Sequence, residues 1–211
     1  MADTYDVITL AEARAALGFG ASDTTRDTLI ARVVTTASNR LDEAIGPVVK
    51  RTVTSEVHSG GSLTIELNHG PVSAVASVTE YQGTSATVVT AETAGTQPTD
   101  GFYAEQYAPD RSLMSGVLVR RVSGNDTCWY WGRGNIQVTY TAGRSESTGA
   151  VAARYKEAGV LILRNLWRPY ENSVGQVDEY QTPVQTFPAF ALPSAVKDLS
   201  REELQSSVGF G

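Results

Sequence analysis

The amino-acid sequence predicts an α+β fold with four components: an N-terminal helical pair and a late long helix forming a small helical bundle, an inserted antiparallel β-sandwich or barrel, and an extended C-terminal arm. Three observations lead to this prediction. Apolar residues recur at helical spacing before residue 46 and again after residue 150. Between Lys50 and Gly143 their spacing changes to two. The last 42 residues, rich in Gln, Ser, Thr and Pro, are too many for an ordinary connection.

These changes of pattern divide the 211-residue chain into four parts. We expect N-terminal helices of the helical core in 1–49, the antiparallel β section in 50–143, a core helix in 144–169 and the C-terminal docking arm in 170–211. An apolar content of 41% suffices for a packed core, and no run approaches the ~18 apolar residues of a membrane-spanning helix. The first residues carry acids and no basic region, so we expect no secretory signal.

The two N-terminal helices have clear start and stop signals. Thr9 and Glu12 form a capping box, so the first helix begins after Thr9, and Gly18 is a suitable end. The second, longer helix is expected to end at Gly46–Pro47. Its apolar stripe comprises Leu29, Ile30, Val33, Val34, Ala37, Leu41, Ala44 and Ile45. The β-branched run 33–36 lowers its intrinsic helical propensity, so this helix requires packing against a neighbour.

The β section is predicted from alternating apolar residues. Strands are expected at 53–57, 63–67, 72–81, 86–90, 116–122 and 135–141. The sequence Ser59–Ser62 is a turn signal, which predicts a hairpin of the first two strands. Residues 91–110, which include Phe102 and Tyr103, are expected to form a loop.

A third long helix is expected over residues 150–168, with Pro169 as its stop. Residues 159–163 are apolar on all sides, which indicates burial against more than one neighbour. In the arm, a short helix is expected to start at Pro193 or Ser194 and to end at Leu199.

The arm also carries most of the net negative charge of the chain. It has two basic and six acidic residues, a net charge of −4 within a total of −6. Its isolated apolar side chains suit a segment that orders on docking to a partner rather than a free linker. We expect the docking residues to be Phe187, Phe190, Leu192, Val196 and Leu199.

The sequence contains no convincing catalytic, metal or cofactor site. Motifs of serine hydrolases, zinc proteases and P-loop proteins are missing, and a hydrolase would need a nucleophile and a base that the sequence does not indicate. His58, His69 and Cys128 lack the paired spacing of a zinc site. No segment has the basic density of a tight DNA binder. We therefore expect a protein that is not an enzyme and has no cofactor.

Trp129-Tyr130-Trp131 is the most unusual short motif. On a strand, Trp129 and Trp131 would share one face and could stack on bases or sugars. A core or subunit-interface position is the more common explanation for such a face. A β-sandwich ligand- or glycan-binding module therefore remains an alternative function.

Four segments resemble the head-to-tail connector (adaptor, or head-completion) proteins of long-tailed bacteriophages. The opening Ile8–Ala13 with the long helix after it is similar to the family's N-terminal helical pair. Residues 67–78 resemble the start of a strand in that family. Residues 136–143, followed by an apolar helix, form the most specific match. Residues 190–193, before a short helix, resemble the C-terminal motif of some relatives.

The resemblance implies a virion protein of the neck, assembled in the host cytoplasm. It implies a ring, usually of twelve subunits, that binds the portal protein, bridges it to the stopper or tail-completion protein, and lines a channel with only transient, non-specific contact with genomic DNA. The arm would then dock on the portal. A stopper or tail-terminator ring of the same neck is the alternative. Ring contacts would involve Val33, Val34, Val160, Leu161, Trp129 and Trp131.

Overall fold

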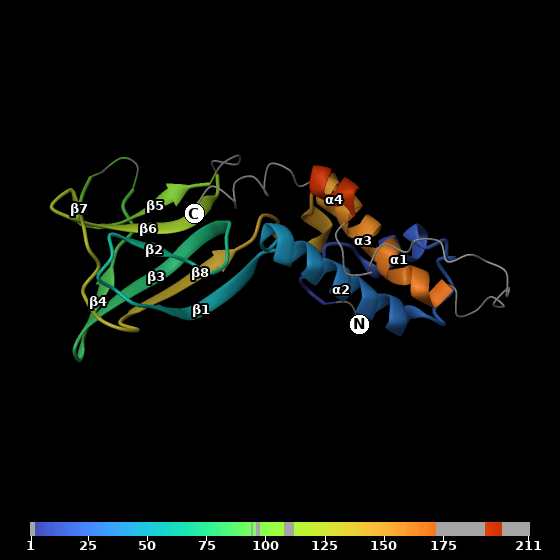
Figure 1. Ribbon diagram of the computed structural model, residues 1–211, viewed down its shortest axis with the longest axis horizontal. Coiled ribbons are helices and arrows are strands. Elements are labelled where there is room, and N and C mark those ends of the chain that lie inside the picture. The colour runs from blue at the N-terminus through green and yellow to red at the C-terminus, as the bar shows by residue number, and fades with distance from the viewer. Residues whose placement is uncertain (1–2, 94, 96–97, 108–111, 172–192, 200–211) are drawn as a thin grey trace. The chain divides into compact units, whose positions relative to one another are not determined.

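The computed structural model describes residues 3–93, 95, 98–107, 112–171 and 193–199 (Figure 1). The chain divides into a helical unit, residues 1–49 with 145–211, and a β unit, residues 50–144. Because helices and an antiparallel sheet occupy separate parts of the chain, the predicted α+β class is confirmed.

The helical unit packs its helices around one apolar core. Its elements are α1 (Leu10–Ala16), α2 (Asp27–Ile45), the 3-10 turn η1 (Thr148–Ala150), α3 (Ala153–Glu171) and α4 (Ser194–Leu199). Buried core residues come from each α-helix and from the segments beside them; they include Val7, Ile8, Ala13, Ile30, Val34, Leu41, Val48, Tyr155, Leu163, Trp167 and Val196. No helix in the described part of the chain has an apolar stretch long enough to cross a bilayer.

The predicted capping box forms at the start of α1. The Thr9 hydroxyl accepts a hydrogen bond from the Glu12 amide, while the Glu12 carboxylate accepts one from the Thr9 amide at 2.8 Å. The other Glu12 oxygen lies 2.6 Å from the Lys156 ammonium of α3. Burial alone would raise the pKa of Glu12, but the bonds from Lys156 and Thr9 outweigh it and hold the pKa below its ordinary value. The capping residue thus also ties α1 to α3.

The end of α3 differs from the prediction. Pro169 was expected to stop this helix, but α3 continues to Glu171 with Pro169 inside it. The buried Trp167 ring packs edge-on against Phe19 at 5.8 Å and against Tyr170 at 5.5 Å. These contacts stabilise the last turn although proline removes one backbone donor.

The β unit is an antiparallel sheet of eight strands folded into two groups. The strands are β1 (Arg51–His58), β2 (Thr64–Glu66), β3 (Val72–Gln82), β4 (Ser85–Val89), β5 (Gly101–Gln106), β6 (Met114–Val122), β7 (Asn125–Thr127) and β8 (Ile136–Ala142). In one group β8 pairs with β1 and β3, and β4 pairs with β3; in the other, β6 pairs with β2, β5 and β7. The groups join where Val72 of β3 pairs with Met114 of β6.

The core of the β unit lies between these two groups of strands. It contains Ile65, Leu67, Val72, Val78, Val89, Phe102, Leu118, Trp129, Ile136, Val138, Tyr140 and Ala142. β8 shows the pattern most clearly, since its residues alternate strictly between buried and half-buried positions. The section is therefore sandwich-like, as the two-residue period predicted.

The predicted hairpin of the first two strands is wrong. β1 pairs with β8, whereas β2 pairs with β6 in the other group. The segment Ser59–Ser62 instead connects the two groups of strands. Its glycine amides bond to a loop that is distant in the sequence: Gly60 donates to the Gly132 carbonyl at 2.9 Å, and Gly61 donates to the Trp129 carbonyl at 3.0 Å.

The predicted loop 91–110 contains a strand. β5 pairs with β6 and places Phe102 in the core, where it is 3% exposed. Its other central residues are only half-buried, so the strand lacks a clear alternation of apolar and polar residues. Gly101 starts β5 in close contact with the neighbouring chain, since a Cβ there would lie 2.4 Å from the Thr90 carbonyl oxygen.

Candidate functional site

Two neighbouring segments of the β unit form what we call the aromatic loop pair: residues 57–63, which are the end of β1 and the loop after it, and residues 128–135, the loop before β8. Besides the two bonds of the glycine turn, the Trp129 amide donates to the Ser62 carbonyl at 2.9 Å. The Asn135 side chain accepts from the Gly60 amide at 2.9 Å and donates to the Tyr130 carbonyl at 2.8 Å. These bonds hold the two segments against each other, although no strand pairing joins residues 59–63 to residues 128–135.

The aromatic loop pair concentrates exposed apolar surface. The described part of the chain has seven large exposed apolar side chains, and four of them belong to this pair. Trp131 is 83% exposed, and Val57, Leu63 and Tyr130 are each about half exposed. Isolated exposed apolar residues are ordinary, but several in adjoining loops mark an interaction surface.

The Trp131 ring lies against the backbone of Gly61. A Cβ on Gly61, which has a φ of +98°, would lie 2.6 Å from Cδ1 of the Trp131 indole. The ring therefore packs directly on the Gly61 backbone. Any other residue at position 61 would displace the Trp131 ring. A large exposed aromatic side chain of this kind is a frequent anchor in protein interfaces.

The expectation that Trp129 and Trp131 share one face is wrong. β7 ends at Thr127, so strand alternation does not apply to residues 128–131. Trp129 is 1% exposed within the core of the β unit, where its indole N–H donates to the Leu118 carbonyl at 3.4 Å. A stacking platform made of both tryptophans is therefore not present.

A buried carboxylate of β3 forms a hydrogen bond with the backbone of the aromatic loop pair. Glu80 of β3 is 4% exposed and accepts a hydrogen bond from the Tyr130 amide at 2.5 Å. Its second oxygen lies 3.8 Å from Arg120 of β6. The Tyr130 backbone is thereby attached to the two central strands of the sheet.

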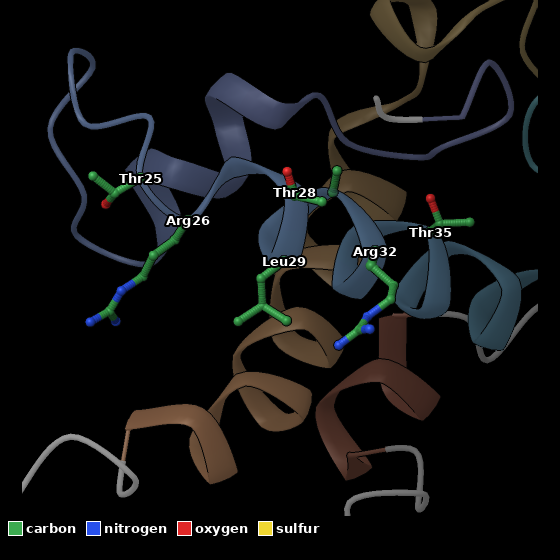
Figure 2. Close-up of a pocket in the computed structure, with 7 residues that line it drawn as sticks. Thr25, Arg26, Thr28, Leu29, Arg32 and Thr35 are labelled. Carbon is green, nitrogen blue, oxygen red and sulfur yellow. The ribbon is translucent and has the colours of Figure 1, made fainter.

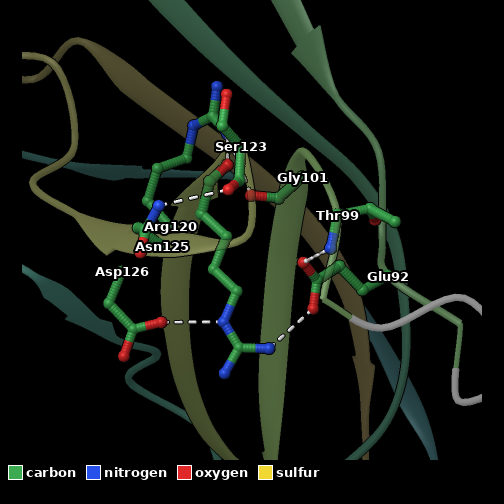
Figure 3. A network of polar contacts seen from close by, with 8 residues as sticks. Glu92, Thr99, Gly101, Arg120, Ser123, Asn125 and Asp126 are labelled. Atoms are coloured by element: carbon green, nitrogen blue, oxygen red, sulfur yellow. Dashed lines mark hydrogen bonds and ion pairs between the residues drawn. The ribbon is translucent and has the colours of Figure 1, made fainter.

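Arg121 is the centre of a second polar network in the β unit, and Figure 3 shows its partners Glu92 and Asp126. Its guanidinium lies 2.9 Å from Glu92 and 2.7 Å from Asp126. Glu92, whose side chain is fully buried, also accepts from the Thr99 amide at 2.9 Å. The network attaches the loop before β5 to the β6–β7 hairpin, so we assign it a structural role.

Glu56, His58 and Tyr140 form the most enzyme-like cluster. The Tyr140 hydroxyl and the His58 ring each lie 2.7 Å from an oxygen of Glu56, which also accepts from the Asn68 amide at 2.9 Å. These bonds outweigh burial and hold the pKa of Glu56 below its ordinary value. Burial, and then the bond to Glu56, raise the pKa of Tyr140. The lowered pKa makes Glu56 a weak base and the raised pKa keeps the Tyr140 hydroxyl protonated, so the bonds between them hold β1 against β8.

Metal ligands are not gathered in the described part of the chain, where no three His, Cys, Asp or Glu side chains are placed to share an ion. His58 bonds to Glu56, and the backbone amide of His69 donates to the Tyr140 hydroxyl at 3.2 Å. Cys128 is exposed at the start of the second segment of the aromatic loop pair.

The other residues predicted to lie in a subunit interface differ in their exposure to solvent. Val33 and Val34 are buried in the core of the helical unit, so α2 uses them inside its own chain. Val160 and Leu161 are half-buried and leave part of their surface accessible. Of this set, Trp131 is by far the most exposed, and no sequence pattern separated it from Trp129.

The predicted docking arm is described only at α4. Val196 is 1% exposed in the core of the helical unit, and Leu199 packs against the same core. Phe187, Phe190 and Leu192 lie outside the described residues. Val196 therefore anchors α4 to its own chain, and the docking role of the residues before it stays a prediction.

Comparisons with known proteins identify a structural relative but no sequence family. No family model matches the chain, and no curated protein matches its sequence. Among solved structures, the fold is similar to a chain of a structure described as "Neck of empty GTA particle computed with C6 symmetry", where GTA is a phage-like gene transfer agent. The alignment covers 92% of this chain and 89% of that chain, with a TM-score of 0.52 and 15% identity. At that identity the match shows a similar fold across nearly the whole of both chains.

Proposed function

We propose that this chain is a structural virion protein that forms the head-to-tail adaptor ring between the portal and the stopper or tail, and that lines the channel for DNA. The observation that carries the proposal is the near-complete fold match to a chain of a particle neck. The resemblance of residues 8–13 and 136–143 to connector proteins supports the adaptor position within a neck.

The charge of the chain supports the same role. A net charge of −6 gives little attraction for the phosphate backbone, as a channel that must release moving DNA requires. The C6 symmetry of the matched neck is compatible with six subunits or with the twelve that the resemblance implies. The proposed role is not enzymatic and involves no cofactor.

In the proposed ring, the aromatic loop pair contacts a neighbouring protein. Trp131 supplies the anchor, with Leu63, Val57 and Tyr130 in the same two segments. This arrangement favours an assembly protein over a glycan-binding module, because the second tryptophan of the suggested platform is buried. A stopper or tail-terminator ring remains the alternative position.

The test is co-purification of the tagged full-length chain with the portal protein of the same particle, followed by electron microscopy. We expect closed rings with six-fold or twelve-fold symmetry attached to one face of the portal. A chain that forms no ring, alone or with the portal, would contradict the proposal. Rings that bind the stopper but not the portal would place the protein at another level of the neck.

The docking arm is tested separately with the triple variant Phe187→Ser, Phe190→Ser and Leu192→Ser. This variant keeps Val196, whose removal with the whole arm would open the helical core. We expect portal binding to be lost while the unfolding midpoint stays unchanged. Portal binding equal to that of the unmodified chain would refute the arm assignment.

A further inference from the structure

A basic groove runs along the first half of α2 (Figure 2). It has a volume of about 530 Å³ and is lined by Thr25, Arg26, Thr28, Leu29, Ala31, Arg32 and Thr35. Arg26, Leu29 and Arg32 extend to the same side of the helix in Figure 2. The lining thus has two positive charges, an aliphatic residue between them and no acid.

The two arginines differ in how far they are engaged. The Arg26 guanidinium lies 5.5 Å from the centre of the Phe19 ring. It also contributes to the lowered pKa of Asp23, although the hydrogen bonds from Thr25 are the larger cause. Arg32 is exposed and forms no ion pair with any residue that the structure describes. The groove is therefore suited to a ligand with carboxylates at both ends and an apolar group at Leu29.

The arm of the same chain begins beside this groove. Phe19, which contacts Arg26, packs against Trp167, and Trp167 packs against Tyr170 near the end of α3. The nearest acids after α3 are Asp178 and Glu179, seven and eight residues past Glu171. Seven extended residues reach roughly 23 Å, whereas Arg26 and Arg32 are about 9 Å apart along the helix axis.

We propose that the groove binds the acidic segment 177–180 of its own chain. Asp178 and Glu179 pair with the two arginines, and Val177 or Tyr180 contacts Leu29. Charge complementarity supports this occupant, because the arm has a net charge of −4 and the groove lining carries two positive charges and no acid. A tether this short gives an effective concentration in the millimolar range, so a dissociation constant in the millimolar range or below is enough to keep the groove largely occupied. The inference does not depend on the ring assignment.

The binding would divide the arm into two parts. Its first residues would be held on the helical unit, while Phe187, Phe190 and Leu192 would remain available to a partner. An acidic partner segment that entered the same groove would release the beginning of the arm.

Hydrogen exchange of the full-length chain tests the proposal. In the unmodified protein we expect the amides of 177–180 to exchange about threefold to tenfold more slowly than in the groove variant Arg26→Glu/Arg32→Glu or in the arm variant Asp178→Lys/Glu179→Lys. Combining the four substitutions reverses both sets of charges and is expected to restore the protection. Arg133→Glu, an exposed arginine of the β unit, makes the same charge change elsewhere and is expected to leave exchange unchanged.

Three results would overturn the proposal. Equal exchange in the unmodified chain and the groove variant would show that the segment is not bound there. Protection that disappears on a hundredfold dilution would assign the segment to a second copy. Protection that survives about 1 M salt would exclude charge pairing as its basis. Should the groove variant lose helical circular dichroism, Arg32→Gln replaces it, with partial loss of protection as the expected result.

Discussion

At the scale of single residues, Trp129 and Trp131 show how little sequence distance says about environment. They are two positions apart, yet one is 1% exposed in the core and the other is 83% exposed on a loop. The difference comes from the end of β7 at Thr127 and from Gly61, on whose backbone the Trp131 ring rests. The first tryptophan therefore stabilises the β unit, whereas the second is available for binding.

Alanine substitutions are expected to separate these roles. Trp129→Ala should lower the free energy of unfolding by about 3–5 kcal/mol, since it empties a large core site. Trp131→Ala should change it by less than about 0.5 kcal/mol but weaken ring assembly about tenfold or more. Urea unfolding and sedimentation velocity with the portal measure the two effects. Full assembly by the Trp131 variant would remove the aromatic loop pair from the interface.

At the scale of elements, α3 is the helix on which the helical unit is built. It contacts α1, α2 and α4, and Gly159 in its interior faces the segment before α1. A Cβ at Gly159 would lie 3.5 Å from Ile8 and 3.6 Å from Val7, both ordinary van der Waals distances. The glycine is therefore not required by space, and it lowers the helical propensity of α3.

Gly159→Ala is expected to raise the free energy of unfolding by about 0.5–1 kcal/mol, because alanine is the better helix former and fits the available space. Thermal unfolding of the full-length chain measures the change. Gly159→Leu is the matched size control and should be destabilising by about 1–3 kcal/mol through overpacking. A lower melting temperature for the alanine variant would show that Val7 and Ile8 cannot adjust.

At the scale of the whole molecule, each unit contains a carboxyl group whose pKa is shifted by its surroundings, and the two respond to pH in opposite directions. Glu56 of the β unit has a pKa held below its ordinary 4.5 by hydrogen bonds that outweigh burial. Asp6 of the helical unit is 1% exposed and accepts hydrogen bonds from the Asp3 amide and Thr35. Burial nevertheless raises its pKa above 3.8. Glu56 thus stabilises the fold at neutral pH, whereas ionised Asp6 opposes it.

These signs give a prediction for two isosteric variants. The contribution of Glu56 is present above its ordinary pKa and is lost as the pH falls through its folded pKa. Glu56→Gln should therefore lose less stability than the unmodified chain between about pH 7 and about pH 3.5. The contribution of Asp6 is present at acidic pH and is lost as the pH rises through its folded pKa, so Asp6→Asn should lose more stability over the same range.

Hydrogen exchange of β8 amides for the Glu56 variant, and of α2 amides for the Asp6 variant, measures each unit by itself. Glu66→Gln, a substitution of an exposed glutamate in β2, is the control for the first variant and should follow the unmodified chain. Parallel pH profiles for all variants would contradict the assigned pKa directions.

The sequence by itself determined the features that depend on neighbouring residues. The capping box at Thr9 and Glu12, the end of α2 at Gly46 and the change to a two-residue period after Lys50 were all predictable. The strand β8, with its strict alternation, was equally clear. Each follows from local backbone geometry, which a short stretch of side chains is enough to indicate.

Only the tertiary structure decided the features that depend on distant contacts. β2 pairs with β6 rather than with β1, and β5 forms inside a predicted loop, because these pairings place Ile65 and Phe102 in one core. The same core takes in Trp129 and leaves Trp131 outside, while aromatic packing extends α3 past Pro169. Local propensities differ by less than about 1 kcal/mol for most residues, whereas burying a large side chain is worth about 2 kcal/mol or more, so long-range packing decides where the two conflict.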